Sequence, residues 1–264
     1  MRLSADADLV RRERVDATLL LTFAREEKLN ALSTSMLERL DDALDAAEHD
    51  DEVRVLVLTG AGAKAFVAGA DIGEYAEQDH EAFVAYQALS RRVFSRLDAS
   101  MKPAVAAVNG YALGGGFEIA LCCDLIVASD RARFGLPEGL LGLVPGGGGT
   151  QRLTRAVGPF VAADVLLSAR RLTAHEAHRL GLVAEVVPPE ELREAALEKA
   201  TAISAIAPLA SREMLGLIRA AADVALEEGL TREQDALARL HRTDDAAEGV
   251  RAFVEKRPPR FRRA

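Results

Sequence analysis

The chain contains no tryptophan, only two cysteines and no long apolar segment. The cysteines are adjacent, Cys122 and Cys123, so they supply neither a secreted disulfide framework nor the paired spacing of a zinc site. The longest apolar runs, such as residues 53–59, fall far short of the ~20 residues that a membrane helix needs. The N-terminal stretch mixes acids with bases and has no apolar core, so no secretory or mitochondrial signal is evident. We therefore expect a cytoplasmic protein with no membrane partner and no metal site.

The amino-acid composition is typical of a globular protein. The 264 residues are 49% apolar and 28% charged, which excludes disorder and allows one large domain with a small appendage. The net charge of −8 argues against nucleic acid as the main partner, because phosphate binding relies on a basic face. The charge is uneven, however, since residues 251–264 carry six cations.

An α/β order is expected over residues 1–189. A hairpin is followed by a helix, and then pairs of short strands alternate with helices about four times. This order predicts an α/β coil of repeated β-β-α units rather than a simple doubly wound sheet. The expected strands are 9–14, 18–23, 53–60, 65–67, 104–108 and 125–128, and the expected helices begin at Ser33 and cover 81–97 and 117–122.

Beyond Gly149 the pattern becomes mostly helical. Helices are expected at 150–156, 159–167 and 173–180, followed by a strand at 184–187. Pro188 and Pro189 are the clearest linker signal, so we divide the chain into residues 1–189 and 190–264. The second region is predicted to contain only helices, whose apolar stripes need a surface from the first region or from another subunit. These helices are expected at 190–206, 209–228, 231–240 and 244–256.

Eleven of the 20 glycines fall between Gly110 and Gly149, in a window that also marks the candidate site. The window matches neither a dinucleotide-binding fingerprint nor a phosphate-binding loop with its lysine. The sequence HEAH from His175 is one residue short of the zinc helix motif, and no G-x-S-x-G elbow occurs. All five histidines lie outside the window, which disfavours a Ser-His or Cys-His pair within it.

The window does contain carboxylates. Glu118 follows the glycine triplet in GGGFE, where a helix should begin with free N–H groups. Glu138 lies in FGLPEG, a stiffened turn with apolar neighbours. Two carboxyls in an apolar cleft can act as general acid and base, because burial raises the pKa of a carboxyl toward neutrality. The alternative is that both are helix-terminal or turn groups that favour the helix dipole.

Four segments carry a resemblance to a known family. They are KAFVAGADI from Lys64, AVNGYALGGGFEIALCCD from Ala107, FGLPEGLLGLVPGGGGTQRL from Phe134 and AFVEKR from Ala252. In this order and spacing they resemble the crotonase superfamily, and enoyl-CoA hydratase most closely. The resemblance implies a crotonase-like spiral, a helical C-terminal trimerisation region at 190–264 and a homotrimer or a dimer of trimers. It also implies an acyl-CoA substrate and no cofactor beyond the CoA of that substrate.

The resemblance also implies roles for individual residues. Two backbone N–H groups that bind the thioester oxygen fall on Ala70 and Gly115, and such donors stabilise an enolate oxygen. Glu118 and Glu138 match the two hydratase carboxyls, with a water between them. Glu118 takes a proton from this water as it attacks the β-carbon, and Glu138 serves the proton on the α-carbon.

The resemblance further implies contacts with CoA. The loop with Arg25 and Lys28, and the segment with Ala68, Asp71, Ile72 and Gly73, resemble those that hold pantetheine and adenine, with Lys64 near the phosphates. Lys256 resembles a lysine that reaches CoA across a subunit boundary, and Phe253 an aromatic residue of the acyl pocket. The alternative for the basic tail is a solvated helix end, which cations favour through the dipole.

Two residues depart from the family pattern. Phe117 is bulkier than the residue expected in short-chain hydratases, and Leu136 replaces a residue that is often polar, so either could change the pocket or the orientation of Glu138. The leading hypothesis is hydration of a 2-trans-enoyl-CoA to 3-hydroxyacyl-CoA. The alternatives are another crotonase reaction, either double-bond isomerisation or thioester hydrolysis, and an RNA-binding relative, which the net charge disfavours.

Overall fold

A computed structural model describes residues 9–262. Residues 1–8, part of the stretch in which no targeting signal is expected, and residues 263–264 lie outside the described residues. The described chain begins with the expected hairpin. Strand β1 (Val10–Val15) pairs antiparallel with β2 (Thr18–Phe23), and the turn places Asp16 at a φ of 51°. Strand β2 then pairs in parallel with β3, which brings the hairpin to the edge of the larger sheet.

The strands divide between two sheets. Each of three successive pairs gives its first strand to a six-stranded sheet and its second to a four-stranded sheet. The pairs are β3 (Val55–Gly60) with β4 (Ala65–Val67), β5 (Ala104–Val108) with β6 (Tyr111–Leu113) and β7 (Leu125–Ser129) with β8 (Arg133–Gly135). The larger sheet has the order β1-β2-β3-β5-β7-β10 and the smaller β4-β6-β8-β9, with β10 at Glu185–Val187 and β9 at Leu172–Thr173. The predicted spiral of β-β-α units is therefore confirmed.

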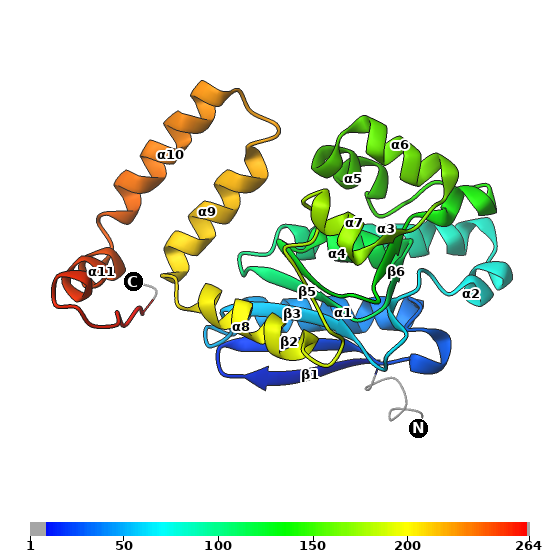
Figure 1. Cartoon of the computed structure of the whole chain (residues 1–264), viewed down its shortest axis with the longest axis horizontal. Coiled ribbons are helices and arrows are strands. Elements are labelled where there is room, and N and C mark those ends of the chain that lie inside the picture. Colours follow the sequence, from blue (N-terminus) through cyan, green and yellow to red (C-terminus); the bar gives the residue numbers. More distant parts are fainter. Residues whose placement is uncertain (1–8, 263–264) are drawn as a thin grey trace.

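Helices connect the turns of the spiral (Figure 1). Helix α1 (Thr34–His49) begins at Ser33, whose hydroxyl accepts a hydrogen bond from the N–H of Met36. Helices α3 (His80–Asp98) and α4 (Gly115–Cys122) follow β4 and β6, as predicted. Helices α5 (Gly149–Val157), α6 (Pro159–Ser168) and α7 (Ala174–Arg179) also match the expected ranges. One short helix, α2 (Ile72–Glu77), was not predicted.

The central strands are apolar on both sides because both faces of the larger sheet are covered. Along β3, Leu56 and Leu58 belong to the main core cluster, whereas Val55 and Val57 belong to a second cluster on the opposite face. Helix α8 (Leu192–Ser204) closes that second cluster with Leu192, Ala196 and Ala200. The expected division after residue 189 therefore separates the sheet from a helix that packs directly on it.

The last three helices are α9 (Pro208–Ala220), α10 (Leu226–Leu240) and α11 (Asp244–Val254). In Figure 1, α9 and α10 form an antiparallel pair that stands away from the sheets. The prediction of one helix over 209–228 is wrong, because the chain turns between α9 and α10. No glycine or proline marks this turn, so only the packing of α10 on α9 determines it.

No single helix within residues 9–262 is long and apolar enough to cross a membrane; α8 and α9 reach this threshold only as a pair bent by 106°.

Candidate active site

A cavity of about 370 Å³ lies where α2, α3 and α4 approach the turn η3 (Pro137–Leu141). Both candidate carboxyls, Glu118 and Glu138, line it. The remaining wall is mostly backbone and apolar side chains, contributed by segments from Leu32 to Gly147. Segments that are far apart in the sequence thus surround one small volume, as expected of a substrate site.

Glu118 is held by the second glycine run, residues 146–149. Its Oε1 atom accepts hydrogen bonds from the N–H groups of Gly147 and Gly149, both at 2.8 Å. The residue is only 3% exposed. Burial raises the pKa of this carboxyl above its usual value, and the backbone donors and the charge of Arg152 offset only part of that increase. Glu118 is therefore a buried carboxyl with a fixed orientation.

Glu138 is held differently. Its Oε2 atom is buried and accepts no hydrogen bond from the described residues. The pKa of Glu138 is raised to about 7, mainly by burial and in smaller part by the charge of Glu118, while its own backbone N–H opposes the increase. The two carboxyls therefore share one cavity and interact electrostatically, but only Glu118 is fixed by other residues. Such a pair can transfer protons near neutral pH.

Two backbone donors lie beside these carboxyls. Gly115 is the first residue of α4, so its N–H has no acceptor within the helix. Leu32 pairs with Ala70 by donating to the carbonyl of Gly69 and accepting from the N–H of Asp71, so the N–H of Ala70 points away from Leu32. Within residues 9–262 neither of these N–H groups donates a hydrogen bond. Both residues line the cavity, so the sites of the predicted oxyanion donors are together.

The glycine triplet allows this close approach. Gly114 has a φ of 51°, and a Cβ atom there would lie 2.9 Å from Oε1 of Glu138 and 3.7 Å from the Cα of Gly69. A Cβ on Gly116 would collide with the carbonyl of Val67. The absence of side chains therefore brings the segment of Gly115 against the segment of Ala70 and places Glu138 beside both.

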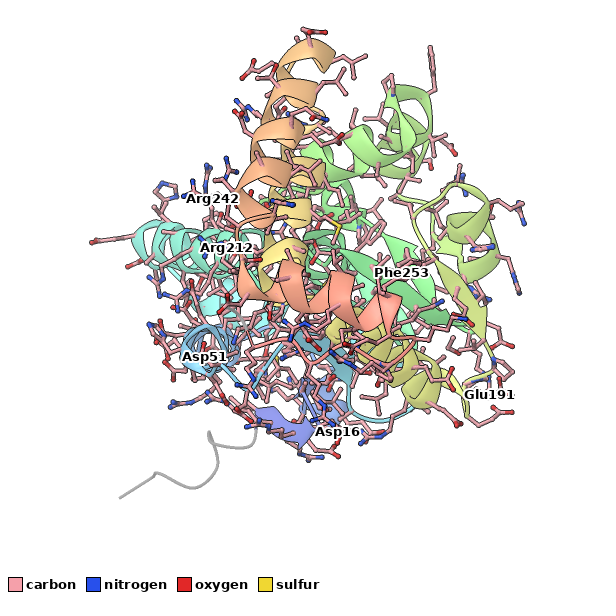
Figure 2. All side chains as sticks on the ribbon, turned by 90° about the vertical axis from the view of Figure 1, so that its left-hand side faces the viewer. Asp16, Asp51, Glu191, Arg212, Arg242 and Phe253 are labelled. Carbon is pink, nitrogen blue, oxygen red and sulfur yellow. The ribbon has the colours of Figure 1, made fainter. Side chains whose placement is uncertain are left out.

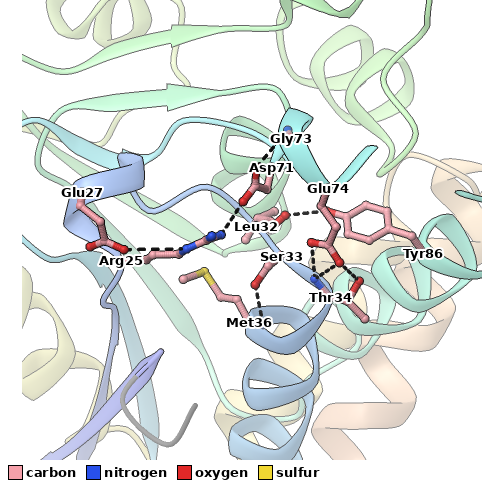
Figure 3. Close-up of polar contacts among 10 residues, drawn as sticks. All are labelled: Arg25, Glu27, Leu32, Ser33, Thr34, Met36, Asp71, Gly73, Glu74 and Tyr86. Carbon is pink, nitrogen blue, oxygen red and sulfur yellow. Dashed lines mark hydrogen bonds and ion pairs between the residues drawn. The ribbon is translucent and has the colours of Figure 1, made fainter. Parts of the chain in front are cut away.

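Among the predicted CoA contacts, Ala68 and Ile72 line the cavity. Arg25 and Asp71 do not line it, and they form an ion pair of 2.7 Å (Figure 3). Asp71 also caps α2 by accepting from the N–H of Gly73 at 3.1 Å. Burial favours a higher pKa for Asp71, but the hydrogen bond and charge of Arg25 and the backbone N–H groups of Gly73 and Glu74 outweigh it, so the pKa is lowered and the carboxyl stays ionised.

These contacts position α2. Figure 3 shows a second tie, in which Glu74 accepts from the backbone N–H of Thr34 at 3.1 Å, at the start of α1. Helix α2 in turn contributes Ile72 and Tyr75 to the cavity. Arg25 and Asp71 thus have a structural role here, and their contact with CoA stays a prediction.

The predicted lysines lie at the surface. Lys28 ends the short turn η2 (Glu26–Lys28), and Lys64 lies in the exposed turn before β4. Phe253 and Lys256 belong to the far end of the molecule, since α11 lies opposite α2 along the long axis in Figure 1. The side chain of Phe253 is 85% exposed on α11, at the face turned toward the viewer in Figure 2. Within one chain, therefore, neither Phe253 nor Lys256 reaches the cavity.

The two departures from the family pattern face away from the substrate space. Phe117 is fully buried and packs on Phe134 with ring centroids 5.3 Å apart. Leu136 is also buried, and it lies where a Cβ on Gly149 would contact it. Neither lines the cavity. The expectation that they could change the pocket directly is therefore not supported.

Sequence reasoning missed a polar group in the wall of the cavity. The hydroxyl of Tyr75 accepts a hydrogen bond of 2.8 Å from Nε2 of Gln87, and Tyr86 donates to the carbonyl of Leu32. Tyr75 and Gln87 both line the cavity, and the ring of Tyr75 packs edge-on against Tyr86 and Phe83. Burial raises the pKa of Tyr75, and the charges of Glu118 and Glu138 add to that increase. The helical spacing of α3 indicated only an apolar face here.

Comparison with known proteins agrees with this geometry. A family profile described as enoyl-CoA hydratase/isomerase matches residues 13–264. The 2,3-dehydroadipyl-CoA hydratase of Escherichia coli is 44% identical over 249 residues, which cover 94% of this chain and 96% of that protein. The short-chain-enoyl-CoA hydratase of Clostridium acetobutylicum is 42% identical, covering 93% and 94%. A crystal structure of enoyl-CoA hydratase from Bacillus anthracis superposes with a TM-score of 0.95 at 37% identity, covering 97% and 100%.

The chain therefore belongs to the enoyl-CoA hydratase/isomerase family, within the crotonase superfamily. Its activity is that of an enoyl-CoA hydratase, and its substrate is an acyl-CoA.

Proposed function

We propose that the chain adds water to a 2-trans-enoyl-CoA by means of Glu118 and Glu138, with the thioester oxygen bound by the N–H groups of Ala70 and Gly115. The observation that carries this proposal is that two carboxyls and two unbonded N–H donors line one cavity. Glu118 removes a proton from a water that attacks the β-carbon. Glu138 delivers a proton to the α-carbon, and the two donors stabilise the enolate oxygen between these steps.

The protonation states support these roles. The raised pKa of Glu138, about 7, keeps part of its population protonated at neutral pH, as an acid requires. The N–H groups of Gly147 and Gly149 favour the ionised form of Glu118, as a base requires. Hydration transfers protons without net oxidation or reduction, so we propose that no cofactor is needed beyond the CoA of the substrate. The reaction requires neither a metal nor nucleic acid.

The experiment that tests this mechanism compares wild type with Glu118→Gln and Glu138→Gln on crotonyl-CoA and longer enoyl-CoAs. Each variant should have a kcat below about a tenth of wild type, since general acid and base groups contribute ~10² or more. A variant that retains more than this would contradict the two-carboxylate mechanism. Reaction in ¹⁸O-labelled water should place the label on the β-hydroxyl, whereas isomerisation would leave the product unlabelled and thioester hydrolysis would label the acid.

For the acyl group we propose short chains. The cavity of about 370 Å³ lies near the lower end of the usual range for small-molecule sites. One of the relatives is named for short-chain enoyl-CoA and another for 2,3-dehydroadipyl-CoA. A kcat/KM series from crotonyl-CoA to decenoyl-CoA should decline with chain length. A rising series would contradict this assignment.

We further propose a homotrimer, or a dimer of trimers, in which helices of the C-terminal region meet neighbouring subunits. Large apolar side chains on α9 and α10 are exposed within one chain, among them Ile218 at 69% and Leu237 at 61%. Phe253 and Lys256, which do not reach their own cavity, would then serve the acyl pocket and the CoA of a neighbour. The CoA of the same subunit would be contacted by Arg25, Lys28, Lys64 and Gly73.

A cytoplasmic location fits the free thiols of Cys122 and Cys123.

A further inference from the structure

The loop that holds Glu118 depends on a second contact outside the cavity. Gly147 and Gly149 donate to the same carboxyl oxygen, which requires the intervening Gly148 to adopt a φ of 108°. This arrangement joins two N–H groups of a flexible glycine run to one acceptor. Without another constraint the run could move away from Glu118, since glycine has the greatest conformational freedom of any residue.

Arg152 supplies that constraint. It lies in the first turn of α5, and its guanidinium folds back so that Nη1 donates to the carbonyl of Gly147 at 2.8 Å. The Nη2 atom donates at 3.0 Å to Asp98, the last residue of α3. A Cβ on Gly148 would collide with this guanidinium, so the glycine also makes room for the arginine. One planar group therefore ties the glycine run to α3.

Arg152 does this without touching the substrate space. It does not line the cavity, and it makes no hydrogen bond to Glu118 within the described residues. Its side chain is only 24% exposed, so its charge is less screened than that of a surface arginine. That charge lowers the pKa of Glu118. Arg152 thus affects both the position of the N–H donors of Glu118 and the pKa of the Glu118 carboxyl.

We propose that Arg152 is a positioning residue for hydration, which holds the N–H groups of Gly147 and Gly149 on Glu118 through the Gly147 carbonyl and Asp98. This inference depends on the proposed role of Glu118 as the base, and it adds a residue that lies outside the cavity. The other titratable groups around Arg152 and Glu118 are Asp98 on α3, Cys122 on α4, Glu138 on η3 and Tyr75 on α2. Asp98 is the only one of these four that Arg152 contacts directly.

The test uses Arg152→Met and Arg152→Lys in steady-state hydration of crotonyl-CoA from pH 5 to 9. Arg152→Met should lower kcat at least 10-fold, because a displacement of about 1 Å at a reacting group can cost ~10². KM should change less than threefold, since the proposed CoA and oxyanion contacts lie elsewhere. The acidic limb of kcat/KM should move to higher pH, because the loss of the cation and of the fixed donors both raise the pKa of Glu118. Arg152→Lys keeps the charge but not the fork, so it should lower kcat with a smaller shift of the limb.

The matched control is Arg155→Met, one turn further along α5, where the side chain is 54% exposed and pairs with Asp223. It should leave kcat and the pH profile unchanged. If Arg152→Met does not fold, as judged by its circular dichroism spectrum and Tm, Asp98→Asn provides the test and should lower kcat several-fold at constant KM. The inference is overturned if kcat of Arg152→Met, or of Asp98→Asn where that variant provides the test, stays within twofold of wild type. It is also overturned if KM rises as much as kcat falls, or if the acidic limb of kcat/KM does not move in Arg152→Met.

Glu118→Gln in the same assay separates this inference from the proposed function. If Glu118→Gln is inactive and Arg152→Met is normal, only the role of Arg152 is wrong. If Glu118→Gln remains active, the proposed mechanism is wrong as well.

Discussion

Glu118 and Glu138 line the same cavity but are held in opposite ways. Oε1 of Glu118 accepts two backbone hydrogen bonds, whereas Oε2 of Glu138 is buried without a donor among the described residues. Hydrogen bonds to a carboxylate favour its ionised form, and burial without them favours the neutral form. The environment thus favours ionisation of Glu118 relative to Glu138, as the proposed roles of base and acid require.

This separation predicts a bell-shaped pH profile. Activity should rise with pH as Glu118 loses its proton, and it should fall above about 7 as Glu138 loses its own. Because the two carboxyls interact, the apparent pKa values belong to the pair. The measurement is kcat/KM for crotonyl-CoA between pH 5 and 9. An activity that still rises at pH 9 would show that Glu138 does not act as a protonated acid.

The raised pKa of Glu138 also predicts a cost in stability. The folded state keeps this proton up to pH about 7, whereas the unfolded state releases it near the usual 4.5, so this contribution to stability is lost as pH rises between these values. Glu138→Gln cannot ionise and should avoid the loss. For a partly exposed group we expect on the order of 1 kcal/mol, or about 2–4 °C in Tm.

Thermal unfolding of wild type and Glu138→Gln at pH 5 and pH 8 measures this difference. The advantage of the variant should be larger at pH 8 than at pH 5, although the variant is expected to be inactive. An equal difference at both values would mean that Glu138 does not carry a raised pKa in the folded protein.

The sequence predicted the two candidate carboxyls, but not the side-chain contacts around them. Glu118 and Glu138 stand in contiguous motifs, and the helix after the glycine triplet could be predicted from local pattern. The bond from Arg152 to Asp98 and that from Gln87 to Tyr75 join residues from separate elements, so no local pattern indicates them. Strands β6 and β8 have three residues each, too few for a periodic signal.

Two expectations from the sequence were wrong because local sequence does not determine packing. Phe117 adjoins Glu118 in the sequence, but adjacent residues of a helix point in different directions, so Phe117 packs in the core. The turn between α9 and α10 has no breaking residue and follows from packing alone.

Gly114 should be essential for activity because a side chain there would meet Glu138, and not only because its backbone conformation favours glycine. An alanine there would place its Cβ 2.9 Å from Oε1 of Glu138, in addition to the strain of a φ of 51°. Gly114→Ala should therefore displace Glu138 and lower kcat by about 10²-fold, as expected for a misplaced catalytic group. The matched control is Gly181→Ala, where φ is 79° but nothing lies within 4 Å of the new Cβ. Equal losses of activity in both variants, measured with crotonyl-CoA, would indicate backbone strain instead.

The exposed apolar side chains of α9 and α10 predict a loss of assembly when they become charged. Ile218→Asp and Leu237→Asp should lower the molar mass measured by size-exclusion chromatography with light scattering, because each would bury an unpaired carboxylate at a subunit contact. Glu233→Ala, at an exposed position of α10, should leave the mass unchanged. If Phe253 and Lys256 serve a neighbouring cavity, dissociation should also raise KM for the enoyl-CoA while the Tm of the remaining fold changes little. If these variants keep the wild-type molar mass, α9 and α10 do not form the subunit contacts.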